Sequence, residues 1–140
     1  MSDRLFHVQV KNRLSELEPL AEKVEQFTSE HGLPPKLAYE LNVILDEIIT
    51  NVTNYGYDDS AEHLIEIRIL LADRALTLEI EDDARPFNPL ERAAPDLTKP
   101  IEERQIGGLG IFFVKKLMDQ VSYEYRSGRN CLTLSKQLPV

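Results

Sequence analysis

Five segments of the chain alternate between apolar and polar residues, which is typical of strands with one buried face. Residues 63–71 and 76–82 are separated by Ala-Asp-Arg-Ala, and residues 121–126 and 131–137 are separated by Ser-Gly-Arg-Asn. Short polar linkers between alternating segments favour hairpins. The fifth segment covers residues 5–10. The chain therefore predicts a sheet in which most neighbouring strands are antiparallel.

Helical periodicity fills the space between the first strand and the first hairpin. Apolar residues recur at helical spacing over residues 17–27, and a longer helix is expected over residues 34–55. Ser15 and Glu18 resemble a capping box for the first of these helices. A third, short helix is expected to end near Met118. This order of elements predicts an α+β fold, a two-layer α/β sandwich with a mixed, mostly antiparallel sheet covered by helices on one face.

Length and composition favour one domain over residues 1–140. Hydrophobic residues make up 42% and charged residues 29% of the chain, which is typical of a globular protein. A net charge of −8 argues against nucleic acid as a direct partner. No apolar run approaches the roughly 20 residues of a membrane span, and no signal peptide is evident, so a cytoplasmic location without membrane contact is expected. A single cysteine, Cys131, and three dispersed histidines predict neither a disulfide nor a zinc site.

The longer helix carries a polar stripe beside its apolar one. Glu47, Asn51 and Asn54 follow one another at i, i+4 and i+7, so they share one side of the helix. A solvated surface is one interpretation of this stripe. However, asparagine is mildly unfavourable within a helix. The second interpretation is a functional site, with a carboxylate base beside an amide oxygen that binds a hard cation such as Mg²⁺.

Two acidic residues, Asp82 and Asp83, follow the second strand of the first hairpin. Their position before Ala-Arg-Pro is compatible with simple turn chemistry. Alternatively, a buried carboxylate at the end of a strand could accept a hydrogen bond from an exocyclic amine, such as the amine of adenine.

Three glycines in four residues, at positions 107, 108 and 110, precede the third predicted helix. Glycine lets the unpaired N–H groups of a helix start approach an anion, which would make a phosphate site. A flexible hinge is the alternative. Residues 87–106 contain three prolines and no clear period, and a loop of this length is usually functional or disordered.

Taken in order, three stretches resemble the N, G1 and G2 boxes of the Bergerat-type (GHKL, histidine-kinase-like) ATPases. They read DEIITNVTNYGY, EDDARPF and GGLGIFFVKKL. The similarity covers nearly the whole chain, and it is strongest to the small stand-alone branch, the anti-sigma-factor serine/threonine protein kinases. It implies ATP and Mg²⁺ as cofactors and the Bergerat fold.

The resemblance also implies a role for each matching residue. Glu47 matches the general base, Asn51 the magnesium ligand, and Asp82 the carboxylate that recognises the adenine amine. Asn54 and Phe87 are implied as further nucleotide contacts, with Phe87 forming an apolar wall near the base. An ATP lid is implied at about residues 87–110, and the glycines at its end that meet the phosphates are Gly107, Gly108 and Gly110.

By this resemblance the chain phosphorylates serine or threonine on a STAS-type anti-anti-sigma antagonist and regulates a sigma factor by partner switching. A homodimer is also suggested. Ala84 stands where the family usually has glycine, which keeps open a non-catalytic ATP/ADP-binding module. A detached sensor histidine kinase is disfavoured because none of the three histidines suits a phosphoacceptor helix, and an ATP hydrolase is disfavoured because no second domain is present to couple to hydrolysis.

Overall fold

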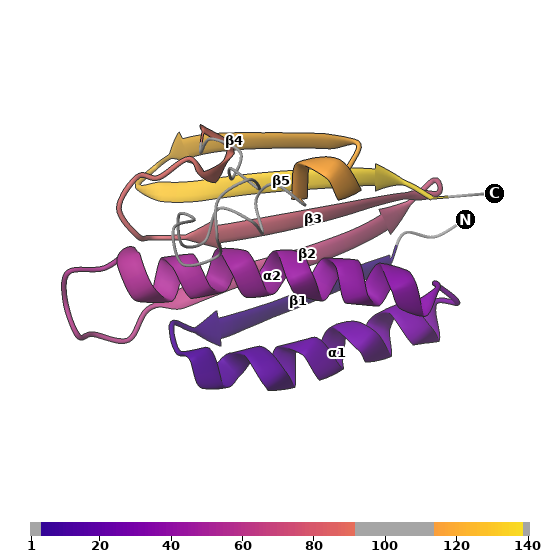
Figure 1. The fold of residues 1–140 in the computed structure, drawn as a ribbon, viewed down its shortest axis with the longest axis horizontal. Helices are drawn as coiled ribbons and strands as arrows, with labels where there is room; N and C mark the ends of the chain where they lie inside the picture. The colour runs from indigo at the N-terminus through magenta and orange to yellow at the C-terminus, as the bar shows by residue number, and fades with distance from the viewer. Residues whose placement is uncertain (1–3, 92–113, 139–140) are drawn as a thin grey trace, which may run out of the picture.

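The computed structural model describes residues 4–91 and 114–138. Five strands in this part of the chain form one sheet in the order β1-β2-β3-β5-β4, and every neighbouring pair is antiparallel (Figure 1). The strands are β1 (Arg4–Lys11), β2 (Leu64–Ala72), β3 (Ala75–Asp82), β4 (Gln120–Arg126) and β5 (Arg129–Gln137).

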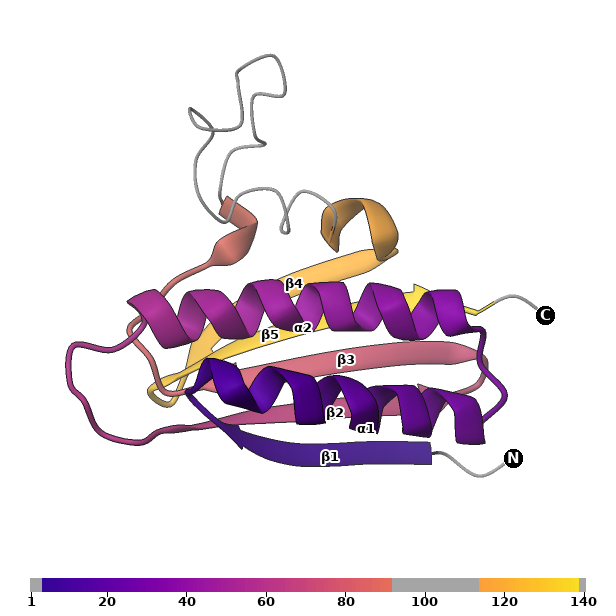
Figure 2. The same ribbon diagram turned by 60° about the horizontal axis from the view of Figure 1, so that its bottom comes forward.

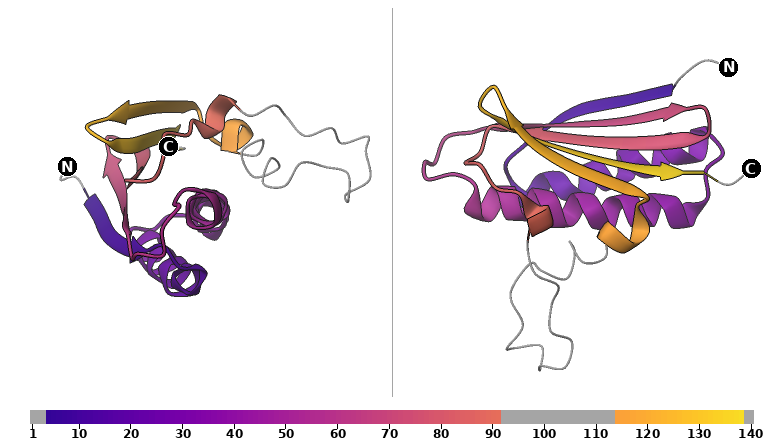
Figure 3. Two further views of the ribbon diagram at one scale, coloured as in Figure 1. Left: turned by 90° about the vertical axis from the view of Figure 1, so that its left-hand side faces the viewer. Right: turned by 90° about the horizontal axis from the view of Figure 1, so that it is seen from above.

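Two long helices cover one face of this sheet. They are α1 (Leu17–Glu30) and α2 (Pro35–Tyr55), and they lie side by side on the same face (Figures 2 and 3). Short 3-10 turns occur at η1 (Leu14–Glu16) and η2 (Pro89–Glu91), and residues 114–117 are helical. The predicted two-layer α/β sandwich is confirmed, with antiparallel pairing between all the described strands.

The hydrophobic core lies between the two helices and the covered face of the sheet. Alternate residues of β2 and β3 point into it, and one face of α2 packs against them. Removing each such large apolar side chain from water stabilises the fold by about 1.5–3 kcal/mol. The fully buried side chains are Leu41, Ile44, Leu45, Ile49, Ile65, Ile67, Ile69, Leu76, Leu78, Ile80 and Leu134.

Both hairpins predicted from the sequence are present, with turns of two residues each. Asp73 and Arg74 connect β2 to β3, and Ser127 and Gly128 connect β4 to β5, all four with positive φ. Such turns match the right-handed twist of the strands that they join. The second turn is therefore shorter than the sequence suggested, and Asn130 belongs to β5.

The predicted capping box at Ser15 and Glu18 is wrong. The 3-10 turn runs directly into α1, so the N-cap position falls on Glu16, which is itself helical and makes no side-chain cap. The Glu16 carboxylate instead accepts a hydrogen bond from the backbone N–H of Lys11 at 2.9 Å.

An ion pair between a buried Glu40 and a partly exposed Lys136 anchors α2 near the end where the helix begins. Glu40 is 6% exposed, and its carboxylate accepts a hydrogen bond from Lys136 Nζ of β5 at 3.0 Å. The opposite end of α2 lies over the end of β3 and the start of β5, at the left of Figure 1. Within the described residues, no helix combines the length and apolar character needed to cross a membrane.

Candidate functional site

A cavity of about 240 Å³ lies between the C-terminal half of α2 and the adjacent end of the sheet. Its helix wall consists of Ile48, Asn51, Val52 and Tyr55, at the i, i+3, i+4 and i+7 spacing of one helical face. Its lining is mostly apolar, which is usual for small-molecule sites. The apolar and polar stripes of α2 therefore meet at this cavity.

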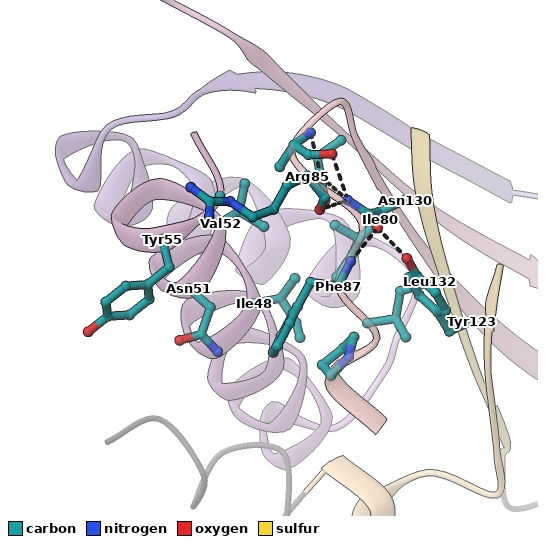
Figure 4. Close-up of a pocket in the computed structure, with 14 residues that line it drawn as sticks. Ile48, Asn51, Val52, Tyr55, Ile80, Arg85, Phe87, Tyr123, Asn130 and Leu132 are labelled. Atoms are coloured by element: carbon teal, nitrogen blue, oxygen red, sulfur yellow. Dashed lines mark hydrogen bonds between the residues drawn. The ribbon is translucent and has the colours of Figure 1, made fainter. Parts of the chain in front are cut away.

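The sheet wall is formed where the core-facing stripe of β3 and β5 ends. Ile80 and Leu132 belong to this stripe, and Asp82 and Asn130 continue it at the rim of the sheet. Figure 4 shows Asn130, Leu132 and Tyr123 across from the α2 side chains. The core-facing side of β3 and β5 is thus apolar up to its last pair of residues, Asp82 and Asn130, which are polar.

Asp82 is the buried carboxylate of the site. It is 4% exposed, and its Oδ1 accepts hydrogen bonds from the Ala84 backbone N–H at 3.0 Å and from Asn130 Nδ2 at 2.8 Å. Burial raises the pKa of Asp82 above its ordinary value, although both hydrogen bonds act in the opposite direction. The sequence prediction of a buried carboxylate at the end of a strand is confirmed in its geometry.

Asn130 was not predicted as a site residue. It is 6% exposed, lines the cavity, and its side chain makes hydrogen bonds with β3, with β4 and with the segment that follows β3 (Figure 4). The residues around Asn130 predict only a turn, so no local sequence pattern marks its place at the cavity.

Glu47 and Asn51 form a pair on successive turns of α2. Asn51 Nδ2 donates a hydrogen bond to Glu47 Oε1 at 3.1 Å. Because a carboxylate only accepts hydrogen bonds, this contact identifies the amide NH₂ and orients the Asn51 oxygen away from Glu47. Asn51 lines the cavity, and Glu47 stands one turn behind it, outside the lining.

The remaining predicted site residues differ in their positions. Phe87 lines the cavity and is 48% exposed, so its ring offers an apolar face to a ligand. Asn54 is exposed and is not among the lining residues, so its nucleotide contact stays a prediction. Gly107, Gly108, Gly110 and most of the predicted lid, about 87–110, lie outside the described residues.

Ala84, where a glycine was expected, is compatible with its backbone. Positive φ among the described non-glycine residues occurs only at Asp73, Arg74 and Ser127. The Ala84 methyl is instead accommodated by Gly56 at the end of α2, where a Cβ would stand 2.8 Å from the Ala84 Cβ. The Gly56 carbonyl also accepts a hydrogen bond from the Arg85 N–H at 3.1 Å. The helix end and the cavity segment are thus fitted to each other.

We expect Gly56→Ala to destabilise the protein by roughly 1–3 kcal/mol, because the new methyl would overlap both Ala84 and the Val52 carbonyl oxygen, 2.6 Å away. Urea denaturation measures this change. The double variant Gly56→Ala/Ala84→Gly should recover part of the loss, since the contact with Val52 remains. A Gly56→Ala protein as stable as the wild type would contradict this packing.

A polar cluster fastens the loop between α2 and β2 beside the cavity. The rings of Tyr57 and His63 stack with centroids 3.9 Å apart. Tyr57 Oη donates to Asp83 Oδ1 at 2.7 Å, and the two His63 ring nitrogens lie 2.9 Å from Asp59 and 3.2 Å from Asp83. Hydrogen bonds to Asp59 and then to Asp83 raise the pKa of His63, and the hydrogen bond with His63 lowers the pKa of Asp59.

This cluster should stabilise the fold most at mildly acidic pH. Because the pKa of His63 is raised in the folded state, its contribution is present below the unfolded value of about 6.5 and is lost as pH rises through the folded value. In urea denaturation, His63→Gln should therefore cost more stability at pH 5.5 than at pH 9.

Tyr57→Phe is the matched control for that measurement. Burial, and then the hydrogen bond to Asp83, raise the pKa of Tyr57 above its ordinary value, so the phenol stays neutral at both pH values. Loss of the Tyr57 hydroxyl should therefore lower the free energy of unfolding by about the same amount at pH 5.5 and at pH 9. Equal losses at both pH values for His63→Gln would contradict a charged His63.

The chain is similar to several known proteins. A family model described as the histidine kinase-like ATPase domain matches residues 10–136. The chain is 26% identical over 100 residues to the serine/threonine-protein kinase BtrW of Bordetella bronchiseptica, covering 71% of this chain and 70% of that protein. It is 31% identical over 87 residues to the anti-sigma F factor of Bacillus subtilis, covering 61% of this chain and 58% of that protein.

A solved structure shares the fold over nearly the whole chain. It contains the RsbU and RsbW domains of Rv1364c from Mycobacterium tuberculosis, with a TM-score of 0.68 at 14% identity. The match covers 96% of this chain and 32% of that one.

Proposed function

The chain belongs to the histidine kinase-like ATPase family, and from this premise we propose that it is an ATP-dependent serine/threonine protein kinase. Its substrate is a STAS-type anti-anti-sigma antagonist, and it regulates a sigma factor by partner switching. Family membership implies ATP as the nucleotide, in agreement with the resemblance found in the sequence.

One observation carries the proposal: Asp82 and Asn51 line the same cavity, from its sheet wall and its helix wall. The buried carboxylate of Asp82 suits a nucleobase with an exocyclic amine. The amide oxygen of Asn51, on the helix wall of the same cavity, suits the cation that accompanies a polyphosphate. A nucleotide placed with its base against Asp82 would direct its phosphates along α2.

Asp82 binds the adenine end. Its carboxylate accepts a hydrogen bond from the exocyclic amine, which is strengthened because the site is shielded from water. Phe87 supplies the apolar wall against the base, and the neighbouring surface of Ile48, Ile80 and Leu132 excludes water from it. The base is thus oriented by one charged acceptor within an apolar slot.

Asn51 provides an oxygen for Mg²⁺ at the phosphate end. The described residues include no cluster of three or more histidine, cysteine or acidic side chains suited to a metal, so the remaining ligands would be phosphate and water oxygens. This donor set fits magnesium, which usually keeps several waters and few protein ligands. When bound, the ion supplies neutralisation of phosphate charge. Gly107, Gly108 and Gly110 of the lid contribute N–H groups to the phosphates in this proposal.

Glu47 acts as the general base. Its carboxylate is held by the Asn51 amide at 3.1 Å, so the base and the metal-binding oxygen keep a fixed relation on one helix. Glu47 takes the proton of the acceptor hydroxyl as that oxygen attacks the γ-phosphorus, and ADP leaves. The acceptor approaches from beyond the nucleotide, which agrees with the place of Glu47 outside the cavity lining.

The named relatives support the choice of substrate and partners. The Bordetella protein carries the name of a serine/threonine-protein kinase, and the Bacillus subtilis protein that of an anti-sigma factor. Similarity to both kinds of protein supports a chain that phosphorylates an antagonist protein and also binds a sigma factor. A homodimer remains part of this proposal.

Incubation with γ-labelled ATP, Mg²⁺ and STAS-domain proteins from the same genome tests the proposal. Label on a serine or threonine of one such protein is the expected result. Bound nucleotide without any label would favour the non-catalytic ATP/ADP-binding module instead. Ala84 was the sequence feature in favour of that module, and its fit against Gly56 removes the conformational objection to nucleotide binding.

A further inference from the structure

Asn130 stands directly opposite Asp82 in the register of β3 and β5. Both side chains point to the core face of the sheet, two register positions beyond the last apolar pair on that face, Ile80 and Leu132. Opposite residues of antiparallel strands are close enough for their side chains to interact. The topology therefore places a carboxamide beside the base-recognising carboxylate.

The carboxamide of Asn130 is fully used. Its Nδ2 donates to Asp82 Oδ1 at 2.8 Å and lies 3.2 Å and 3.0 Å from the carbonyl oxygens of Ala84 and Arg85. Its Oδ1 accepts hydrogen bonds from the Phe87 N–H at 3.1 Å and from the Tyr123 hydroxyl. A carboxamide with every hydrogen and lone pair engaged cannot rotate without leaving buried groups unpaired.

The two oxygens of Asp82 consequently differ. Oδ1 accepts from Asn130 and from the Ala84 N–H, whereas no hydrogen bond from the described residues reaches Oδ2. The carboxylate lines the cavity, so Oδ2 is the oxygen available to a ligand. Asn130 fixes which oxygen is presented and keeps it an acceptor.

We propose that Asn130 is a positioning residue for nucleobase selectivity. By holding the Asp82 carboxylate in place, Asn130 makes the site accept a purine that carries an amine, such as adenine, and reject one that carries a carbonyl at the same position, such as guanine. Adenine directs an amine toward Oδ2, whereas guanine would direct a carbonyl oxygen at a fixed acceptor. This inference rests on the proposed nucleotide-binding function of the same cavity, and it goes beyond it by assigning selectivity to a residue other than Asp82.

The pKa of Asp82 depends on Asn130 and on the charges nearby, so a substitution at Asn130 should change the protonation of Asp82. Burial raises the pKa of Asp82, Asp83 adds to that rise, and Asn130, the Ala84 N–H and Arg129 oppose it. Replacing Asn130 by aspartate sets a second carboxylate against Oδ1, and two adjacent carboxylates retain a shared proton to higher pH. In the state where the retained proton resides on Asp82 and points to the ligand, the carboxyl group can donate to the guanine carbonyl, so the preference for ADP is reduced.

The test compares ADP and GDP affinities by calorimetry for wild type and Asn130→Asp. The wild type should prefer ADP by at least about 100-fold. In Asn130→Asp this ratio should fall by about tenfold or more at pH 6.5 and recover as pH rises. Asn42→Asp, at an asparagine that links α2 to the Ala21 carbonyl away from the cavity, is the matched control and should keep the wild-type ratio.

Asn130→Ser removes the amide without adding charge, and it decides the question if Asn130→Asp does not fold. Its ratio should also fall, because Oδ1 loses its amide donor and the carboxylate can turn. Equal weakening of ADP and GDP would reduce Asn130 to a structural role and overturn the inference, as would an unchanged ratio. Wild-type protein that binds ADP without preference over GDP also overturns it, whereas wild-type protein that binds neither refutes the proposed function itself.

Discussion

Replacing Glu47 by glutamine should lower the rate of phosphotransfer to a STAS partner by about 10²–10⁴-fold, the usual contribution of a general base. Glutamine keeps an oxygen that can accept the Asn51 amide, so the geometry of the pair and the cavity should survive. Affinity for ADP should therefore change little. Single-turnover transfer of labelled phosphate, measured beside calorimetric binding of ADP, separates the two effects.

Asp46→Asn is the matched control for Glu47→Gln. Asp46 is the preceding residue of α2, and it is exposed and lies near the Thr50 hydroxyl rather than at the cavity. Its loss of charge should leave the transfer rate within about twofold, since surface substitutions away from a site have small effects. Transfer by Glu47→Gln at the wild-type rate would remove Glu47 from the role of base.

Asn51→Ala should be nearly as damaging, with a loss in transfer rate of at least about 10²-fold. Phosphoryl transfer depends mainly on positioning and on neutralisation of phosphate charge, and this substitution removes the protein oxygen assigned to the cation. It should also abolish the gain in ATP affinity that Mg²⁺ gives the wild type. Calorimetry with Mg²⁺ and with EDTA measures that gain directly.

Asn42→Ala provides the control on the same helix, because Asn42 contacts α1 and not the cavity. It should retain both the transfer rate and the effect of Mg²⁺ on ATP affinity. If Asn51→Ala kept the full magnesium dependence, the cation would have to be held by other residues.

Local pattern was enough to predict most of the fold. Strand alternation placed both hairpins, and helical periodicity placed α1 and α2 with ends close to those observed. The capping box failed because a 3-10 turn leads into α1 and moves the N-cap position to Glu16. A four-residue pattern cannot show whether the preceding residues are already helical.

The positions of the candidate site residues were predictable where they depend on one helix or one strand end. The spacing of Glu47 and Asn51 is a local property, and so is the position of Asp82 at the end of β3. Asn130 was missed because its role depends on the register between β3 and β5, which joins residues 48 positions apart. The fit of Ala84 against Gly56 is likewise a tertiary contact that no sequence window contains.

Titration of ¹⁵N-labelled protein with Mg-ATP, followed by two-dimensional NMR, tests the central claim that the cavity between α2 and the end of β3 and β5 holds the nucleotide. The largest shifts among the described residues should fall on the amides of Asn51, Asp82, Phe87 and Asn130. Shifts concentrated on the groove between α1 and α2, which includes Ala21 and Asn42, or no binding at all, would contradict it.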